Sequence, residues 1–335
     1  MNKEKFLGPW IKRFLLEYLI TERNLSRNTL LSYRDTFRQC IPFISKKIKK
    51  PVHQLTVKDM SSNGIKQYLQ DLESRCRSIS TRNQRLSAIH AFADFIGLNS
   101  PEHIEWCRQI RLIPLKKTKQ SEITYLEKNE MKALLAAPNK STAQGRRDYA
   151  LLLFLYNSGA RASEVAQLKI EDLHIASDRK KNFSTVQITG KGNKLRRCPL
   201  WKETANELSS LIASREQNEH VFLNRLGQPL TRFGVHNLVG RYVKKILSSS
   251  PSLKNKRISP HTIRHTTATH LLNAGVDINT IRAWLGHVSI NTTNIYVEVD
   301  MEIKAKALAS CESVGKRVRK LVDKENEFTQ FLDAI

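Results

Sequence analysis

The sequence predicts a mainly α-helical protein, in which a bundle of helices precedes a mostly helical domain with a small antiparallel sheet. Apolar residues recur at helical spacing through most of the first hundred residues and again through most of the second half. A segment at 112–123 lacks this periodicity and contains a proline and three lysines, as exposed linkers do. Residues 184–189 and 194–200 flank the glycine-rich turn 190–193, and this pattern predicts a strand, a turn and a second strand.

The first domain is predicted to span residues 1–111 and to be entirely helical. Its helices are expected at about 7–19, 30–41, 57–72 and 81–97. A polar break separates the first two, which we interpret as an antiparallel pair. Thr56 and Asp59 resemble a capping box at the start of the third helix, and Gly97 is expected to end the fourth. Each arginine on these helices, taken alone, is more typical of a solvated face than of a nucleic-acid contact.

The second domain is predicted to span residues 124–300, after the linker at 112–123. Its helices are expected at about 128–136, 147–157, 202–214, 232–247, 262–273 and 278–285. Gly159 follows the second of these helices and suits a left-handed C-cap. Residues 301–335 are predicted to form an amphipathic helical tail, whose apolar stripe needs a surface to cover it. That surface belongs either to its own domain or to a neighbouring copy of the chain.

The chain is strongly basic, since 56 Lys and Arg residues against 31 Asp and Glu residues give a net charge of +25. A polyanion is therefore the expected partner. The surplus lies on both sides of the linker, which favours a protein that encloses a duplex over one with a single basic arm. RNA or an acidic membrane surface would explain the charge alone equally well.

Several classes of protein are excluded by composition. No stretch reaches the roughly 18 apolar residues that a membrane span needs. The amino terminus carries charges inside its first apolar segment and lacks a secretory signal, so we expect a cytoplasmic protein. The five cysteines are scattered and never form Cys-x-x-Cys, which argues against a disulfide framework and against a structural zinc site.

His261 and Arg264 open a predicted helix directly after Ser259-Pro260. Their spacing places an imidazole and a guanidinium on one face at the amino-terminal end of the helix, where an anion is favoured. This arrangement suits a phosphate that gains charge in a transition state. His265 adds a His-x-x-x-His spacing, but the glutamate of the zinc-protease pattern and a third ligand are missing. Taken alone, His-x-x-Arg is a weak signal.

Further candidate residues lie on both sides of this helix. Arg161 follows a predicted glycine cap, and Glu164 is spaced to orient it. Lys191 lies between two glycines that let the backbone approach a ligand closely. His287 ends a Leu-Gly-His phrase, and Tyr296 stands nine residues later. Taken alone, Arg161, Lys191 and Tyr296 also have ordinary interpretations, as a helix-end arginine, a solvated turn lysine and a half-buried packing tyrosine.

The ordered set of these residues resembles the catalytic signature of the tyrosine recombinases, the phage integrase family. Its members here are Arg161, Lys191, His261, Arg264, His287 and Tyr296. The likeness covers residues from about 124 to 300 and includes the sequence motifs around Arg161 and His261. The first hundred residues are similar to the helical core-binding domain of this family, especially at Asn24-Leu25-Ser26.

The resemblance implies a transesterification that needs neither a metal nor another cofactor. Tyr296 would attack the scissile phosphate and become linked to the 3′ phosphate. Lys191 would protonate the departing 5′ oxygen, and His261 would assist proton transfer with the tyrosine hydroxyl. Because the ester keeps the bond energy, a 5′ hydroxyl of a partner duplex can reverse the step.

The resemblance also implies that Arg161 and Arg264 hold the nonbridging phosphate oxygens, and that His287 contacts the scissile phosphate. The expected partner is double-stranded DNA, with a dimer on each site, a tetramer in the synapse and strand exchange through a Holliday junction. The tail at 301–335 would then contact a neighbouring protomer. Because the core-binding helices begin near Leu7, we expect the simple two-domain type without an arm-binding domain.

The expected activity is site-specific DNA recombination, which serves integration, excision or resolution, in a mobile element or on a chromosome. A type IB topoisomerase shares the chemistry, and a purely DNA-binding protein shares the charge. The complete residue set argues against the binding protein. The short linker, the two-domain size and the matching phrases favour a recombinase over a topoisomerase.

Overall fold

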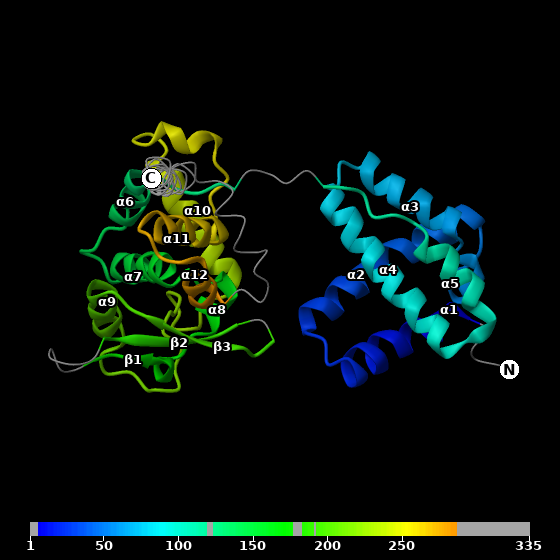
Figure 1. Cartoon of the computed structure of the whole chain (residues 1–335), viewed down its shortest axis with the longest axis horizontal. Coiled ribbons are helices and arrows are strands. Elements are labelled where there is room, and N and C mark those ends of the chain that lie inside the picture. Colours follow the sequence, from blue (N-terminus) through cyan, green and yellow to red (C-terminus); the bar gives the residue numbers. More distant parts are fainter. Residues whose placement is uncertain (1–5, 119–122, 177–182, 191, 287–335) are drawn as a thin grey trace, which may run out of the picture. The chain divides into compact units, whose positions relative to one another are not determined.

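The computed structural model describes residues 6–118, 123–176, 183–190 and 192–286 (Figure 1). The chain divides into two compact units, Met1–Ser121 and Glu122–Ile335. Both units are mainly helical, and the second contains a three-stranded antiparallel sheet, so the predicted fold class is confirmed.

Helices form most of the described part of the first unit. They are α1 (Leu7–Arg13), which continues as a π-helical segment (Phe14–Glu22), α2 (Arg27–Ile48), α3 (Ser62–Ser74), α4 (Ile79–Asn99) and α5 (Ile104–Arg111). Short 3-10 turns lie at Val52–Gln54, Val57–Asp59 and Pro101–His103. Ser26 caps α2 and Ser78 caps α4, because each side chain accepts a hydrogen bond from the backbone N–H three residues on.

The third helix begins later than the sequence predicts. Thr56 and Asp59 form the expected capping box, but it closes only a single 3-10 turn. Asp59 Oδ2 accepts hydrogen bonds from the Thr56 backbone N–H at 2.7 Å and from Lys50 Nζ at 2.6 Å. The backbone leaves the helical region at Met60, with φ −79° and ψ 54°. Helix α3 therefore starts with a cap of its own, Ser61.

The prediction that Gly97 ends the fourth helix is wrong, because α4 continues to Asn99. The glycine serves packing instead, since a Cβ at this position would lie 3.2 Å from Cys107 Sγ on α5. The sequence pattern does not predict α5, an eight-residue helix. A helix of two turns carries too little periodicity to stand out.

An aromatic cluster fills the core of the first unit. The ring centre of Phe14 lies 6.0, 5.3 and 5.4 Å from those of Phe37, Phe92 and Phe95. All four rings are buried. Such edge-on and tilted contacts add to the free energy gained from the buried area. The cluster thereby joins the π-helical segment to α2 and α4.

The predicted linker begins with residues that are packed on the first unit. Ile113 is 2% exposed, and the Pro114 carbonyl accepts a hydrogen bond from Arg82 Nη1 at 3.1 Å. Asn83 Nδ2 donates to the Lys116 carbonyl at 2.7 Å, while the Lys116 N–H donates to Asn83 Oδ1 at 3.0 Å. The other residues of this segment up to position 118 are exposed, as the sequence predicts, although side chains of α4 bind its main chain at Pro114 and Lys116.

The second unit combines helices with a small sheet. Its helices are α6 (Lys128–Ala136), α7 (Ala143–Ser158), α8 (Ala162–Gln167), α9 (Lys202–Ile212), α10 (Arg232–Ile246), α11 (Pro260–Asn273) and α12 (Ile278–Leu285). Short 3-10 turns lie at Ile170–Asp172 and Pro251–Asn255. The strands are β1 (Leu173–His174), β2 (Thr185–Thr189) and β3 (Leu195–Pro199), in the order β1-β2-β3. Ile188 of β2 pairs with Arg196 of β3 in the antiparallel register.

The strands and helix ends predicted for this unit agree closely with the structure, but the prediction omits two short elements. Helix α8 has six residues and β1 has two, and elements this short leave no periodic signal. Helix α7 also starts before the predicted 147, at Ala143, because Thr142 caps it through the N–H of Gly145.

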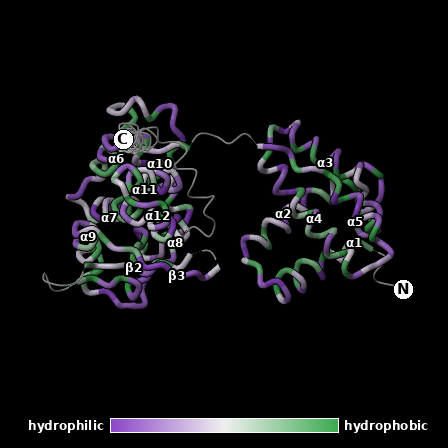
Figure 2. The backbone as a smooth tube through the Cα atoms, in the orientation of Figure 1, coloured by the Kyte–Doolittle hydropathy of each residue, from purple (hydrophilic) through white to green (hydrophobic). Residues whose placement is uncertain are grey.

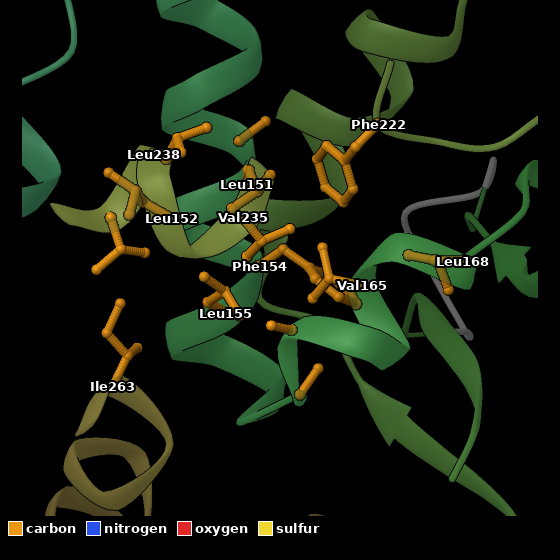
Figure 3. Packing of buried hydrophobic residues seen from close by; sticks show 14 of the residues in the cluster. Leu151, Leu152, Phe154, Leu155, Val165, Leu168, Phe222, Val235, Leu238 and Ile263 are labelled. Atoms are coloured by element: carbon orange, nitrogen blue, oxygen red, sulfur yellow. The ribbon is translucent and has the colours of Figure 1, made fainter. Parts of the chain in front are cut away.

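Helix α7 lies in the hydrophobic core of the second unit (Figure 3). Figure 3 shows its side chains Leu151, Leu152, Phe154 and Leu155 among apolar side chains from α8, α10 and α11. Burial of this many large apolar side chains is the main source of stability for such a unit. It also fixes the carboxyl end of α7, which leads into the candidate site.

Apolar and polar residues are mixed along the helices of both units (Figure 2). Within the described ranges, no helix is both long enough and apolar enough to cross a membrane. The described cysteines are free thiols, and Cys40, Cys107 and Cys198 are buried while Cys76 is exposed.

Candidate active site

The predicted catalytic residues all fall in the second unit. The structure describes Arg161, His261 and Arg264. Outside the described residues lie Lys191, His287 and Tyr296. The residues directly before two of these, Gly190 and Gly286, are described, so the structure places the ends of the segments that lead to Lys191 and His287.

Arg161 lies between α7 and α8, where the chain turns sharply. Gly159 ends α7 with φ +59°, and a Cβ there would lie only 2.4 Å from Leu285 Cδ2. Only glycine meets both constraints without strain. Arg161 is the residue directly before α8, and its Nη1 donates to Glu164 Oε1 at 2.7 Å. The guanidinium is thus oriented by Glu164, as the spacing predicts, while the side chain stays 36% exposed.

Arg264 lies on α11 and joins the ends of two other helices. Its Nη1 donates to the Gly159 carbonyl and its Nη2 to the Leu285 carbonyl, both at 2.7 Å. The residue is 1% exposed. The last carbonyls of a helix lack partners within the helix, so a guanidinium placed there supplies both donors and a favourable charge. One buried side chain therefore sets the positions of the segments that lead to Arg161 and to His287.

His261 lies in the first turn of α11, which begins at Pro260 and is capped by Ser259. Partial burial lowers the pKa of His261 below its usual 6.5, and the positive charges of Arg264 and Arg161 lower it further. The imidazole is therefore mainly neutral at pH 7, the form that accepts a proton. His261 and Arg264 share the start of α11, but His261 lies at the surface and Arg264 in the interior.

His265 lies one turn after His261, with 4.3 Å between the two ring centres. Burial lowers the pKa of His265 to about 4, and the nearby charges of His261 and Arg264 contribute. Both rings are thus kept uncharged near neutral pH. Among the described residues, no group of three or more His, Cys, Asp and Glu side chains is arranged to hold a metal ion.

Glu164 is the buried carboxylate of the site, with a side chain 4% exposed. Its Oε1 binds Arg161, and its Oε2 accepts from the Arg161 backbone N–H at 2.8 Å and from Arg196 Nη2 at 2.7 Å. Burial alone would raise the pKa of Glu164, but the contacts with Arg196 and Arg161 outweigh it and hold the pKa below its usual value. The carboxylate is therefore charged at neutral pH and shared by two arginines.

Arg196 is the residue of this site that the sequence does not single out. It lies on β3, pairs in register with Ile188 and has a side chain 8% exposed. A basic residue in a hairpin is usually solvated, and nothing local in the sequence indicates its contact with α8. The signal that leads to Arg196 is the burial of Glu164, because a buried charge is normally paired and hydrogen-bonded.

Two family models match the chain. The phage integrase family matches residues 124–302, more than half of the 335-residue chain, and the N-terminal SAM-like domain of phage integrases matches residues 11–97. The chain belongs to the phage integrase family.

The relatives of this phage integrase family member include recombinases that match it along nearly their whole length. A putative integrase/recombinase, y4rC, of Sinorhizobium fredii is 36% identical over 312 residues, which cover 92% of this chain and 92% of that protein. The tyrosine recombinase XerC of Pelobacter propionicus is 32% identical over 296 residues, covering 87% of this chain and 91% of the relative. The chain is a tyrosine recombinase, an enzyme of site-specific DNA recombination.

Solved structures share the fold of this integrase family member. The Tn1549 transposon integrase in complex with circular intermediate DNA matches with a TM-score of 0.65 and 20% identity, over 88% of this chain and 97% of that chain. The site-specific recombinase XerH, bound to a palindromic difH substrate, matches with a TM-score of 0.63 and 21% identity, over 90% and 95%.

Proposed function

We propose that this tyrosine recombinase cuts and rejoins double-stranded DNA through a 3′-phosphotyrosyl intermediate, with Tyr296 as the nucleophile. The observation that carries the proposal is the position of Arg264. Its guanidinium binds the carbonyls of Gly159 and Leu285, which lie two residues before Arg161 and two residues before His287. A single buried side chain thus gathers three chain segments that carry the family's catalytic signature.

The first step transfers the phosphate from DNA to the protein. The Tyr296 oxygen attacks phosphorus, a new P–O bond forms, and the bond from phosphorus to the 5′ oxygen breaks. A tyrosine hydroxyl has a pKa of about 10, so it needs a base near neutral pH. Neutral His261 is suited to take that proton. Lys191 donates a proton to the departing 5′ oxygen.

The charge that develops on the phosphate is balanced by the arginines. Arg161 reaches the surface while Glu164 fixes its orientation, so its guanidinium is preorganised for a nonbridging oxygen. Arg264 adds a fixed positive charge from the interior. His287 completes the contacts to the scissile phosphate. Rejoining reverses the sequence, with a 5′ hydroxyl of a partner strand attacking the phosphotyrosyl ester.

The proposed partner is duplex DNA, bound by a dimer at each site and by a tetramer in the synapse. The net charge of +25 and the DNA complexes formed by the Tn1549 integrase and by XerH support DNA as the partner. We assign residues 1–111 to DNA binding and residues 124–300 to catalysis. The tail at 301–335 would contact a neighbouring protomer.

The test is recombination between two sites on one plasmid. Selection of bound duplexes from a random-sequence pool identifies the site, and two copies are then placed on a supercoiled plasmid. We expect deletion or inversion of the intervening segment in the presence of a metal chelator. Relaxation without exchange of flanking sequence would indicate a topoisomerase, and binding without strand exchange or relaxation would indicate a DNA-binding protein.

A further inference from the structure

Arg196 is connected to the site by a contact that links the sheet to α8. Its Nη2 donates to Glu164 Oε2 at 2.7 Å, on the carboxylate that orients Arg161. The side chains of Arg196 and Glu164 are 8% and 4% exposed, so water screens their attraction weakly. The two arginines are unequal, because Arg161 reaches the surface and Arg196 does not.

The guanidinium of Arg196 also lies against two glycines that precede expected catalytic residues. A Cβ on Gly190 would lie 3.6 Å from Arg196 Nη1 and 3.5 Å from Glu164 Oε1. A Cβ on Gly286 would lie 3.0 Å from Arg196 Cδ and 3.4 Å from Nη1. Both backbones therefore pack closely on the arginine, one residue before Lys191 and one residue before His287.

The energetics of Arg196 indicate a role beyond holding the fold. Among the described residues, its buried Nε has no hydrogen-bond acceptor. An unpaired buried donor costs free energy, and a buried ion pair is often no more stabilising than apolar residues of similar volume. Methionine at position 196 would remove only one partner of the pair, so Glu164 would keep Arg161 as its cation but lose a hydrogen bond to Oε2. What the arginine adds is a fixed position for the carboxylate.

We propose that Arg196 is a positioning residue that acts on the reaction through Glu164 and Arg161. It holds the carboxylate in place, so that Arg161 presents its guanidinium to the nonbridging oxygen of the scissile phosphate. This inference rests on the proposed function. It predicts that loss of Arg196 slows the chemical step, because a displacement of about 1 Å in a catalytic group can cost on the order of a hundredfold in rate.

A double-mutant cycle tests the proposal. The variants Arg196→Met, Arg161→Lys and the double variant are compared with the wild-type chain by single-turnover cleavage of a nicked suicide duplex at saturating DNA. We expect Arg196→Met to slow adduct formation by at least about tenfold. In the Arg161→Lys background the same change lowers the rate by less than about threefold, because residues that act through one another are not additive.

A matched control separates positioning from stability. Arg215 is a partly buried arginine of the same unit that binds Glu219 and the carbonyls of His220 and Val221. We expect Arg215→Met to lower the thermal midpoint at least as much as Arg196→Met, while its cleavage rate at saturating DNA stays within about twofold of wild type. Duplex affinity is measured for every variant, and we expect it to change by less than about threefold.

The outcomes distinguish this inference from the proposed function. A wild-type chain that forms no adduct overturns both. If the wild-type chain forms the adduct, either of two results overturns only the role of Arg196. In the first, Arg196→Met forms the adduct as fast as wild type. In the second, it lowers the rate by the same factor in the wild-type and Arg161→Lys backgrounds. If Arg196→Met does not fold, Arg196→Lys replaces it in the cycle. One ammonium can still reach Glu164, so we expect a smaller loss with the same non-additivity.

Discussion

Arg264 donates a hydrogen bond of 2.7 Å to the carbonyl oxygen of Leu285, the last residue of α12. Arg264→Lys keeps the charge but loses the fork that also reaches Gly159. We expect the free energy of unfolding to fall by about 1–3 kcal/mol, the cost of a buried acceptor left unpaired. The cleavage rate is expected to fall by orders of magnitude, with little change in duplex affinity. Urea unfolding and single-turnover cleavage measure these effects.

The control for this change is Arg282→Lys, on α12 itself. Arg282 lies on the same helix as Leu285 and is only partly buried, so its replacement by lysine is expected to leave unfolding unchanged within about 0.5 kcal/mol. An Arg264→Lys chain as stable as wild type would show that the two carbonyl contacts are dispensable.

Because α7 approaches α12 closely at Gly159, we expect two glycines to lose different amounts of stability when each is replaced by alanine. Gly159 and Gly275 both have positive φ, at +59° and +85°. A Cβ on Gly159 would lie 2.4 Å from Leu285 Cδ2, whereas a Cβ on Gly275 would meet nothing within 4 Å. Gly275→Ala isolates the backbone strain of about 1–2 kcal/mol. Gly159→Ala adds an overpacking cost of about 1–3 kcal/mol.

Thermal and urea unfolding of both glycine variants provide the measurement. Gly159→Ala is expected to be clearly less stable than Gly275→Ala and to cleave more slowly, because Leu285 and the end of α12 must move. Equal losses of stability in the two variants would contradict the close packing of these helices.

The environment of His261 predicts how its protonation depends on pH. Burial and the charges of Arg264 and Arg161 lower its pKa, so the neutral base persists below pH 6.5 and is lost only at lower pH. NMR titration of the labelled imidazole, assigned with His261→Gln, is expected to give a midpoint below 6.5. Arg161→Gln removes one of the charges and is expected to raise that midpoint. A midpoint at or above 6.5 in the wild-type chain would contradict the effect of burial and of these charges on the pKa of His261.

The net charge predicts a steep dependence of DNA binding on salt. Each phosphate neutralised by a basic side chain releases counterions. For every such phosphate, the logarithm of the DNA-binding constant K falls by about 0.9 when the salt concentration rises tenfold. Because both units of this +25 chain are expected to contact the duplex, the slope for the full chain corresponds to several phosphates. Fluorescence anisotropy over a salt series measures it. A nearly flat plot would rule out binding along a long stretch of duplex.

Local sequence signals account for much of the site. Ser259-Pro260 marks the start of α11, Gly159 marks the end of α7, and the three-residue spacing from Arg161 places Glu164 within hydrogen-bond reach. Each of these features depends on neighbouring residues along the chain, which is why the sequence predicts them. The resemblance of the ordered set to the family's signature singled out Lys191, His287 and Tyr296, which lie outside the described residues.

Long-range contacts account for what the sequence does not predict. Arg196 reaches Glu164 across 32 positions, and Arg264 reaches Gly159 across 105. No local pattern distinguishes such an arginine from a solvated one. Helix α8 is hidden for another reason, because six residues give less than two turns of periodicity. The attachment of Pro114 and Lys116 to α4 is likewise invisible in a segment with linker composition.

The central claim is a covalent link between Tyr296 and the 3′ phosphate of DNA, a product that neither a binding protein nor a metal nuclease leaves. The most direct measurement uses a duplex nicked close to the cleavage position, so that the short 5′-hydroxyl strand diffuses away and the adduct accumulates. Tyr296→Phe removes one oxygen, so folding and duplex affinity are expected to be retained.

With a metal chelator present, we expect the wild-type chain to form a denaturant-resistant adduct on this substrate and Tyr296→Phe to form none. Peptide mapping of the wild-type adduct is expected to place the DNA on Tyr296. An adduct formed by Tyr296→Phe, or DNA mapped to another of the eight tyrosines, would contradict the assignment of the nucleophile.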